Sequence, residues 1–359
     1  MKIATLIVVV VVILVIGVAA IYYVFVQTAG PTLCGSKWEC AAGYPVEVGG
    51  TYAIAGQQCV NATSTMYCIG GQDANGGPRN EVYYATASSS GNITGWTQDS
   101  AAYPQNSNGG SCVLYGGYVY CVGGSYNDAG DDLALSYYAQ VTTGGPLGTW
   151  SPTTSYPIPI DTMSCVGSSG YIYCVGGENE TDGSYADTAP TNSVWFASLS
   201  SSGIGSWEHT TAYPASVQFP TCYSGGGYIY CIGGADVNGN SVGTTYYAAL
   251  TSSGVGTWTA TTSYPMAASG QACVITSGEI LCVGGQTSNN PSYTSSVYYA
   301  PILPGGGVGT WKQGTSYPLA IGTTCVALSG DLYCVGGFDG SSVMADNYVE
   351  YASVASLTG

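Results

Sequence analysis

Charged side chains are scarce in this sequence. They make up 7% of its 359 residues, against roughly 25% in an average soluble protein. Bases are rarest, with four Lys+Arg and one His beside twenty Asp+Glu, so the net charge is -16. Nucleic-acid binding through the phosphate backbone needs a basic surface, which excludes nucleic acid as a partner. A single histidine also excludes a histidine-rich metal site.

Apolar and aromatic residues are plentiful by comparison. Hydrophobic residues reach 45% and aromatic residues 12%, and the chain holds 54 glycines, 32 tyrosines and 14 cysteines. A chain with this much apolar material is poorly suited to intrinsic disorder. We therefore expect a folded protein rich in strands, turns and disulfide bonds.

An uncharged apolar run covers residues 3–26. As a helix it would be about 36 Å long, enough to cross a ~30 Å hydrocarbon core. We expect a transmembrane anchor over residues 1–26, with Lys2 on the cytoplasmic side and the chain from Gln27 onward outside. Two alternatives stay open: a signal peptide cleaved near Ala19-Ala20, and a pilin-like helix that packs into a filament core.

Cysteines and sequons also indicate the outside of the cell. Fourteen cysteines is an even number, as expected for complete pairing in an oxidising compartment. Three sequons begin at Asn61, Asn92 and Asn179, which we predict to carry N-glycans. The expected location is the cell surface, as a single-pass membrane protein with an extracellular C-terminal domain.

A repeat of 51 to 57 residues dominates the rest of the chain. Each copy has a short strand ending in Cys-x-Gly-Gly, then a polar loop, an aromatic strand such as the VYYA of 82–85, and a Trp followed by a Tyr-Pro. Internal repetition of this period is typical of arrays and propellers. The six Cys-x-Gly-Gly motifs end at Gly71, Gly124, Gly177, Gly234, Gly285 and Gly337.

The order of the repeat parts predicts a closed ring. Only five Trp strands follow the six Cys-x-Gly-Gly strands, and the sixth lies at the other end of the chain, where Trp38 precedes Tyr44-Pro45. The chain thus begins with a fourth strand and ends with a third. Pairing the two would remove the exposed sheet edges of an open array.

This pattern resembles the kelch repeat, in which a diglycine ends the second strand and an aromatic residue and a spaced Trp follow. The resemblance covers residues 38–359 and implies an all-β fold, a six-bladed β-propeller with four strands a blade. Residues 27–37 would form a stalk. Tyr-, Ser- and Gly-rich kelch arrays stapled by cysteines also resemble archaeal cell-surface proteins.

Twelve cysteines form six pairs of the form Cys-x8-Cys. With Gly116-Gly117 as a two-residue turn, Cys112 faces Cys121 at a non-hydrogen-bonded pair, where the Cα atoms are ~4.5 Å apart. Zinc and redox sites use Cys-x2-Cys instead. Cys34 and Cys40 are left to pair with each other or with another subunit. The predicted hairpin disulfides are Cys59–Cys68, Cys112–Cys121, Cys165–Cys174, Cys222–Cys231, Cys273–Cys282 and Cys325–Cys334.

Strand order also assigns the two faces of the ring. The loops that join second to third strands (2–3 loops) share one face with the 4–1 loops, and the anchor enters on the opposite face. The 2–3 loops vary and hold twelve of the twenty acids, which indicates a binding face; the alternative is that Asp, Asn and Gly only form turns. The candidate binding residues are Asp73, Tyr126, Asp128, Asp132, Asp182, Tyr185, Asp236, Tyr293 and Asp339.

The sequence has few residues suited to catalysis or to metal binding. His209 is the only histidine and Arg79 the only arginine, too few for a copper oxidase or for the arginine cluster of sialidase-type propellers. No carboxylate pair suited to glycoside hydrolysis stands out. Asp73-Ala-Asn-Gly and Asp236-Val-Asn-Gly-Asn resemble fragments of Ca²⁺ loops but lack the terminal Glu, and the same residues form ordinary turns. We expect no catalytic residue, no bound metal and no cofactor, with Ca²⁺ as the open alternative.

The function that these features favour is non-catalytic. We expect a membrane-anchored adhesion or binding module that recognises a surface protein or a glycan through aromatic and polar loops. A structural subunit of an envelope or pilus-like filament, assembling with itself, is the first alternative. A secreted carbohydrate-active enzyme is the second.

Overall fold

The computed structural model describes residues 11–15, 18–22, 34–35, 37–48, 51–126, 132–142, 144–179, 189–288, 292–339 and 345–359. Contacts divide the chain into two compact units, Met1–Leu33 and Cys34–Gly359. Within the first, β1 (Val11–Val15) and β2 (Val18–Tyr22) pair in antiparallel fashion, with Val15 opposite Val18.

The transmembrane helix expected in residues 3–26 is not found. Residues 11–15 and 18–22 are strands, and the other positions of that run lie outside the described residues. The described residues include no helix with the length and apolar character to span a bilayer. The physical reason lies in the composition: the run is rich in Val and Ile, whose branched side chains favour extended backbone over helix. Most of the stalk, residues 27–37, also lies outside the described residues.

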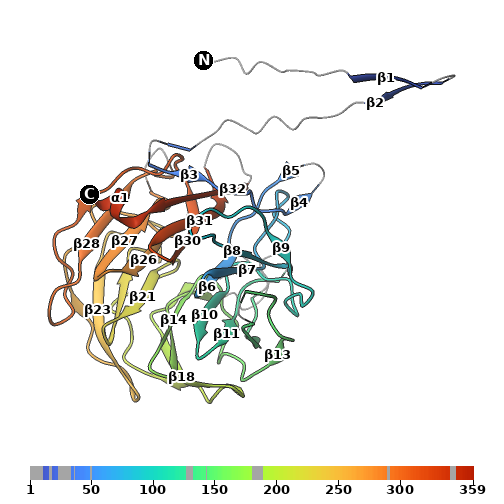
Figure 1. Ribbon diagram of the computed structural model, residues 1–359. Coiled ribbons are helices and arrows are strands. Elements are labelled where there is room, and N and C mark those ends of the chain that lie inside the picture. The colour runs from blue at the N-terminus through green and yellow to red at the C-terminus, as the bar shows by residue number, and fades with distance from the viewer. Residues whose placement is uncertain are drawn as a thin grey trace. The chain divides into compact units, whose positions relative to one another are not determined.

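The second unit is a six-bladed β-propeller of antiparallel sheets (Figure 1). We number the blades in chain order, and the four successive strands of a blade run from the centre of the ring outward. Blades 1 to 3 consist of β6 (Gln58–Ala62), β7 (Thr65–Ile69), β8 (Val82–Thr86) and β9 (Thr97–Gln98); β10 (Ser111–Tyr115), β11 (Tyr118–Val122), β12 (Ser136–Gln140) and β13 (Ser151–Pro152); and β14 (Ser164–Ser168), β15 (Tyr171–Val175), β18 (Val194–Ser200) and β20 (Glu208–His209).

Blades 4 and 5 have the same strand order, whereas blade 6 takes its outermost strand from the N-terminal side of the unit. Blades 4 to 6 consist of β21 (Thr221–Gly225), β22 (Tyr228–Ile232), β23 (Thr245–Thr251) and β25 (Thr259–Ala260); β26 (Ala272–Thr276), β27 (Glu279–Val283), β28 (Val297–Pro301) and β29 (Lys312–Gln313); and β30 (Gly322–Leu328), β31 (Asp331–Phe338), β32 (Ala345–Ser353) and β3 (Glu39–Cys40). The short additions are β4 (Glu47–Val48), β5 (Thr51–Tyr52), β16 (Glu178–Asn179), β17 (Ala189–Pro190), β19 (Gly203–Ile204), β24 (Gly254–Val255) and α1 (Val354–Thr358).

Blade 6 joins the two ends of the propeller unit. Its outermost strand, β3, comes from the N-terminal side and pairs with β32, with Glu39 opposite Tyr351. Lys37 Nζ also donates a hydrogen bond to the carbonyl of Ser356 in α1. The permuted order of the repeats predicts this pairing, and it closes the ring.

Glycine pairs end the second strands because the backbone turns sharply there. In blade 2, Gly123 and Gly124 have φ of 65° and 95°, values that L side chains rarely adopt. A Cβ on Gly123 would lie 2.5 Å from the carbonyl oxygen of Ile160 in the next connection. The Cys-x-Gly-Gly motif is therefore required both by backbone conformation and by close approach to the neighbouring blade.

Aromatic contacts repeat at every seam between blades. The Tyr of each Tyr-Pro packs edge-on against the Trp of the next blade, as in Tyr103 and Trp150, whose ring centroids are 5.0 Å apart. Trp150 Nε1 also donates to the carbonyl of Ala101. The other five seams have the same ring pair at 4.8 to 5.0 Å, in Tyr44–Trp96, Tyr156–Trp207, Tyr213–Trp258, Tyr264–Trp311 and Tyr317–Trp38.

A second seam contact comes from the tyrosine before Cys-x-Gly-Gly. The hydroxyl of Tyr120 donates to the carbonyl of Ser200 at 2.8 Å, and that of Tyr173 to Thr251 at 2.7 Å. Both acceptors are the last residue of the third strand of the next blade. Burial raises the pKa of both tyrosines to about 12, since an ionised phenol loses its hydration there.

The disulfide prediction is confirmed. Each predicted cysteine pair lies directly across its hairpin, with Cα atoms 4.0 to 4.1 Å apart, and Cys34 bonds to Cys40. In blade 2 the turn residues Gly116 and Gly117 have φ of 58° and 82°, as a two-residue hairpin turn requires. No described cysteine is free.

Removing one hairpin disulfide should lower stability without changing the fold. Cys273 and Cys282 are fully buried, and in the chain-entropy model their ten-residue loop stabilises the fold by about 2–3 kcal/mol. We expect the Cys273→Ala, Cys282→Ala variant to lose that much free energy of unfolding, measured by guanidinium denaturation. A variant as stable as wild type would show that the bridges do little for the folded state.

Alkaline pH should destabilise the propeller in the pH range between the pKa of tyrosine in the unfolded chain and the higher pKa of the buried tyrosines in the folded protein. Unfolded tyrosine ionises near ~10, whereas Tyr120 and Tyr173 ionise at about 12 when folded. Their stabilising contribution is thus complete below pH ~10 and is lost as pH rises towards the folded pKa. We expect the free energy of unfolding to fall in that window, followed together with phenolate absorbance. Tyr120→Phe should make the free energy of unfolding depend less steeply on pH in this window. If all tyrosines of the folded protein ionised near pH ~10, the raised pKa values of Tyr120 and Tyr173 would be contradicted.

Candidate functional site: the mouth of the central channel

A channel of about 800 Å³ runs along the propeller axis. It is lined by the innermost strand of every blade, from β6 to β30, and it extends to the 2–3 and 4–1 loops at Gln72, Asn108 and Asp161. That volume falls within the range of small-molecule sites, about 300–1,000 Å³. We call this end of the channel, on the face of the 2–3 loops, the mouth.

Along the channel, hydroxyl side chains form hydrogen bonds with some of the backbone groups at the open edges of the innermost strands. The residue before the first cysteine of the hairpin is Ser or Thr in four blades. Ser111 Oγ accepts from the N–H of Cys165 at 2.9 Å, and Thr324 Oγ1 donates to the carbonyl of Gln57 at 3.0 Å. In these four blades the contacts tie the inner strand edge to the next blade, which protects backbone groups that have no strand partner.

A chain of backbone hydrogen bonds surrounds most of the mouth. Three residues before the first cysteine, five blades have a residue with positive φ, between 49° and 69°. From the second of these residues on, each N–H donates to the carbonyl of the equivalent residue in the preceding blade, as from Thr162 to Gly109 at 2.8 Å and from Phe219 to Thr162 at 3.0 Å. The five residues are Gly56, Gly109, Thr162, Phe219 and Gly270.

Two members of that chain are not glycine, Thr162 and Phe219, and Phe219 is the bulkier of the two. Glycine occupies the equivalent position in blades 1, 2 and 5, because it adopts positive φ without cost. Phe219 has φ of 49° and keeps 43% of its surface exposed, although a bulky residue in this conformation is strained by about 1–3 kcal/mol. Backbone strain of this kind is concentrated at functional sites. Here the strained residue carries an aromatic ring that lies at the mouth.

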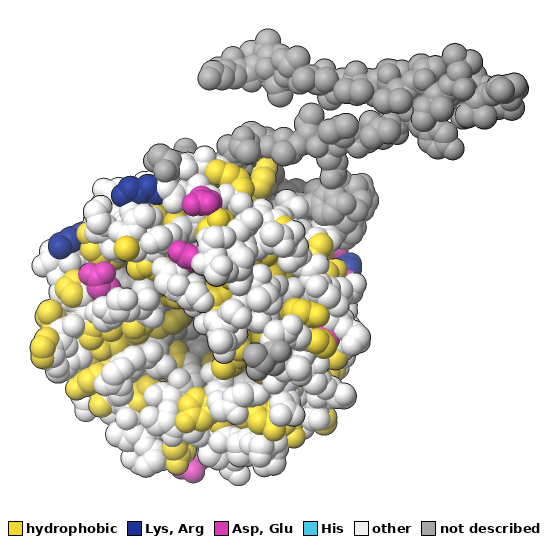
Figure 2. Space-filling model, in the orientation of Figure 1, with side chains coloured by type: hydrophobic (Ala, Val, Ile, Leu, Met, Phe, Trp, Pro, Cys, Tyr) yellow, Lys and Arg dark blue, Asp and Glu magenta, His cyan; other side chains and the backbone are white. Residues whose placement is uncertain are grey.

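Apart from Asp161, the other polar side chains at the mouth are neutral, and aromatic rings lie among them. Tyr293 and Phe338 line it from blades 5 and 6, and Gln286 is exposed beside them. Across the ring, Asn108 Nδ2 donates to Gln72 Oε1 at 2.6 Å. Charged side chains are few on the face of the molecule shown in Figure 2.

Two of the predicted binding residues lie together at the mouth. Tyr293 is half-buried in the channel lining, and burial, with a smaller effect of the Asp339 carboxylate, raises its pKa. Asp339 directly follows Phe338, which lines the channel. Tyr126 is 40% exposed, and Asp132 forms a backbone bridge with Ser125 in the same loop of blade 2. Asp128, Asp182 and Tyr185 lie outside the described residues.

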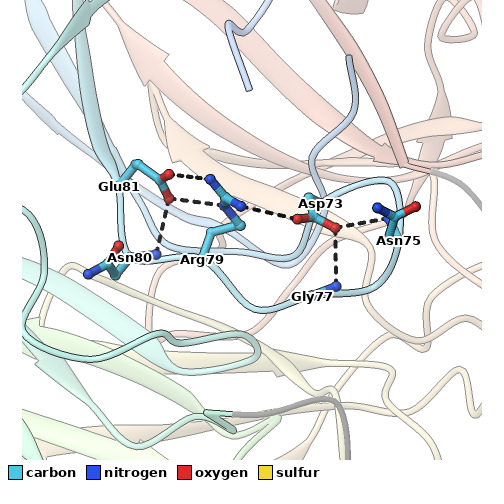
Figure 3. Close-up of polar contacts among 6 residues, drawn as sticks. All are labelled: Asp73, Asn75, Gly77, Arg79, Asn80 and Glu81. Atoms are coloured by element: carbon cyan, nitrogen blue, oxygen red, sulfur yellow. Dashed lines mark hydrogen bonds and ion pairs between the residues drawn. The ribbon is translucent and has the colours of Figure 1, made fainter. Parts of the chain in front are cut away.

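Asp73 is placed inside its own loop (Figure 3). Its side chain is 7% exposed; Oδ1 accepts from the N–H of Asn75 at 2.9 Å and of Gly77 at 3.2 Å, and Oδ2 faces Arg79 at 3.3 Å. Arg79 also forms an ion pair with Glu81. Burial alone would raise the pKa of Glu81, but the hydrogen bond and charge of Arg79 outweigh it, so this pKa is lowered. The carboxylate of Asp73 therefore orders a loop.

Asp236 stabilises a similar turn in blade 4, but in solvent. Its Oδ1 accepts from the N–H of Asn238 at 2.9 Å and of Asn240 at 3.0 Å, and these backbone hydrogen bonds lower its pKa. Both calcium-like fragments thus use an aspartate oxygen for turn geometry. Among the described residues, no group of three or more His, Cys, Asp or Glu side chains is arranged to hold a metal ion.

The three sequon asparagines lie on different parts of the ring. Asn61 in β6 is exposed, and its Nδ2 donates to the carbonyl of Ala327 at 2.9 Å. Asn92 is half-buried in the turn after β8, and Asn179 Nδ2 donates to the carbonyl of Pro159 at 2.7 Å. Their glycosylation stays a prediction.

Sequence reasoning missed Phe219, Gln72, Asn108, Gln286 and Phe338. Each stands at a repeat position next to the diglycine or just before the first cysteine, where the copies differ. A comparison of the six copies three residues before the first cysteine would have shown Phe219 and Thr162 in place of glycine. Nothing in a single repeat indicates that these positions meet at one end of a channel.

The strain at Phe219 predicts an unusual order of stabilities. Phe219→Ala and Phe219→Gly both remove the ring, but only glycine relieves the backbone, so we expect the glycine variant to be more stable by about 1 kcal/mol. At Phe338, which lies in a strand without positive φ, the order should reverse by about 0.5–1 kcal/mol. Chemical denaturation of the four variants measures both differences; the same order at both sites would contradict the strain.

Comparisons with known proteins identify the fold and nothing finer. The propeller is similar to the solved structure of YjhT, with a TM-score of 0.67 and 14% sequence identity over 86% of this chain and 95% of that one. No protein-family model and no curated protein sequence matches the chain. At this identity the likeness supports the six-bladed propeller as an architecture.

Proposed function

We propose that the protein is a kelch-type propeller of the cell surface that acts as a non-catalytic binding module through the mouth of its channel. The observation that carries this proposal is Phe219, an exposed aromatic side chain held at a strained backbone position where blades 1, 2 and 5 have glycine. The positive φ serves the backbone hydrogen bonds of Phe219 with Thr162 and Gly270, and glycine would provide them without strain. A strained phenylalanine in place of glycine is expected to persist where a ligand uses the side chain.

The location is supported by covalent chemistry. Seven disulfides join the described cysteines, and such bonds persist in oxidising surroundings outside the cytosol. The apolar residues 3–26 would attach the protein to the membrane. The repeat pattern and the dense disulfides together support a surface protein of the archaeal kelch style.

The form of the mouth supports binding. Aromatic rings and side-chain amides surround a preformed opening, and both kinds of group are common in recognition sites. Each blade contains a hairpin disulfide and the blades close into a ring, so the mouth is held by a rigid scaffold. A ligand would therefore meet groups that are already in position, which reduces the entropy cost of binding.

Binding to whole cells and to a glycan array tests the proposal. The full-length, oxidised protein should bind, and Phe219→Ala should weaken binding by roughly tenfold, since the loss of one aromatic contact is worth about 1.4 kcal/mol. Leu303→Ala is the matched control, because Leu303 is 45% exposed in the turn after β28 on the opposite face and should bind as wild type does. Binding that survives Phe219→Ala would exclude the mouth. Absence of binding together with a regular polymer of the full chain would favour the structural subunit.

A further inference from the structure

The charge of the side chains at the mouth indicates which class of ligand it can bind. Its described lining includes no lysine, arginine or histidine. The described bases are engaged elsewhere. Lys37 donates to the carbonyl of Ser356, and Arg79 pairs with Asp73 and Glu81. Lys312 Nζ lies 5.9 Å from the ring centroid of Tyr299, and the His209 ring packs edge-on against Trp195. An anionic ligand would therefore find no cation to pair with.

Long-range electrostatics act in the same direction. The chain carries a net charge of -16, so its field repels anions approaching from solvent. Asp161 lines the mouth, and Asp339 is close enough to Tyr293 to affect its ionisation. Sialylated, sulfated and phosphorylated ligands are disfavoured both on approach and on contact.

The uncharged groups of the mouth match a sugar. Phe219 and Tyr293 present ring surfaces on which the C–H face of a pyranose can pack. Gln72, Asn108 and Gln286 carry amides, which can serve hydroxyl groups as donors or acceptors. Asn108 Nδ2 donates to Gln72 Oε1, and this pair still offers the N–H donors of Gln72 and the side-chain carbonyl of Asn108. A channel of about 800 Å³ has room for more than one sugar ring.

We propose that the mouth binds a neutral saccharide, with Phe219 and Tyr293 as stacking surfaces and the amides of Gln72, Asn108 and Gln286 as hydroxyl partners. This inference rests on the proposed function and specifies its ligand. A cationic ligand would use the same rings, but the polar groups named here are mostly amides, so the neutral class fits them better. Selectivity then comes from the ring faces and amides together with the exclusion of acids.

Glycans arranged in matched sets test the ligand class. The sets share a neutral hexose or N-acetylhexosamine core and differ by a terminal sialic acid, a sulfate or an amine. The full-length protein should bind the neutral members at least tenfold more tightly than the acidic ones, as expected when a charge-assisted contact is missing. Binding of the neutral members should be insensitive to added salt, whereas an amine would bind less tightly as salt increases.

Variants of single side chains separate stacking from other contributions. Phe219→Trp keeps an aromatic face and should stay within roughly threefold of wild type, whereas Phe219→Leu keeps apolar bulk and should bind roughly tenfold less tightly. Gln286→Glu, at an exposed position, should weaken neutral binding or leave it unchanged. A gain in affinity from this added carboxylate would identify a cationic ligand and overturn the neutral assignment.

The outcomes separate this inference from the function on which it rests. Preference for acidic or aminated glycans, or for a protein on whole cells, with loss on Phe219→Ala would overturn the neutral saccharide and leave the binding mouth intact. Binding that ignores every change at Phe219 would overturn both. Neutral glycan binding that is lost in Phe219→Leu and kept in Phe219→Trp supports both.

Discussion

The seams between blades are the interaction on which the rest of this structure depends. A single four-stranded blade has two faces to cover, and only neighbouring blades can cover them. At all six seams the Tyr of a Tyr-Pro packs edge-on against a Trp of the next blade. Because the last seams need a complete sixth blade, the pairing of β3 with β32 is required for every blade to have two neighbours.

Closure of the ring also creates the channel and its chemistry. Six innermost strands turn their free edges to the axis, and hydroxyl side chains such as Ser111 and Thr324 hydrogen-bond across to the next blade. Near the mouth, residues of positive φ continue these ties through their backbone. With the scaffold held by repeated contacts and by hairpin disulfides, single positions at the mouth can depart from the repeat without loss of the fold.

Those departures are where the molecule is specific. Phe219 replaces glycine at a strained position, and Tyr293 packs over Gly322, where an added Cβ would lie 3.1 Å from its ring. The acidic 2–3 loops divide between two roles: Asp73 and Asp236 shape turns through backbone N–H groups, whereas Tyr293 and Asp339 lie by the mouth. A face rich in variable residues thus contains both scaffold and recognition groups.

The sequence by itself determined the ring. The repeat period, the diglycines, the cysteine spacing and the displaced Trp38 predicted six blades, the hairpin disulfides and the closing strand, because these are local patterns repeated at a fixed interval. It did not determine residues 11–15 and 18–22, where length and apolarity predicted a helix and the structure has strands. Only the tertiary structure decided the site, because Gln72, Asn108, Phe219 and Gln286 come from different blades. They meet only when ring closure brings equivalent positions of separate repeats to one axis.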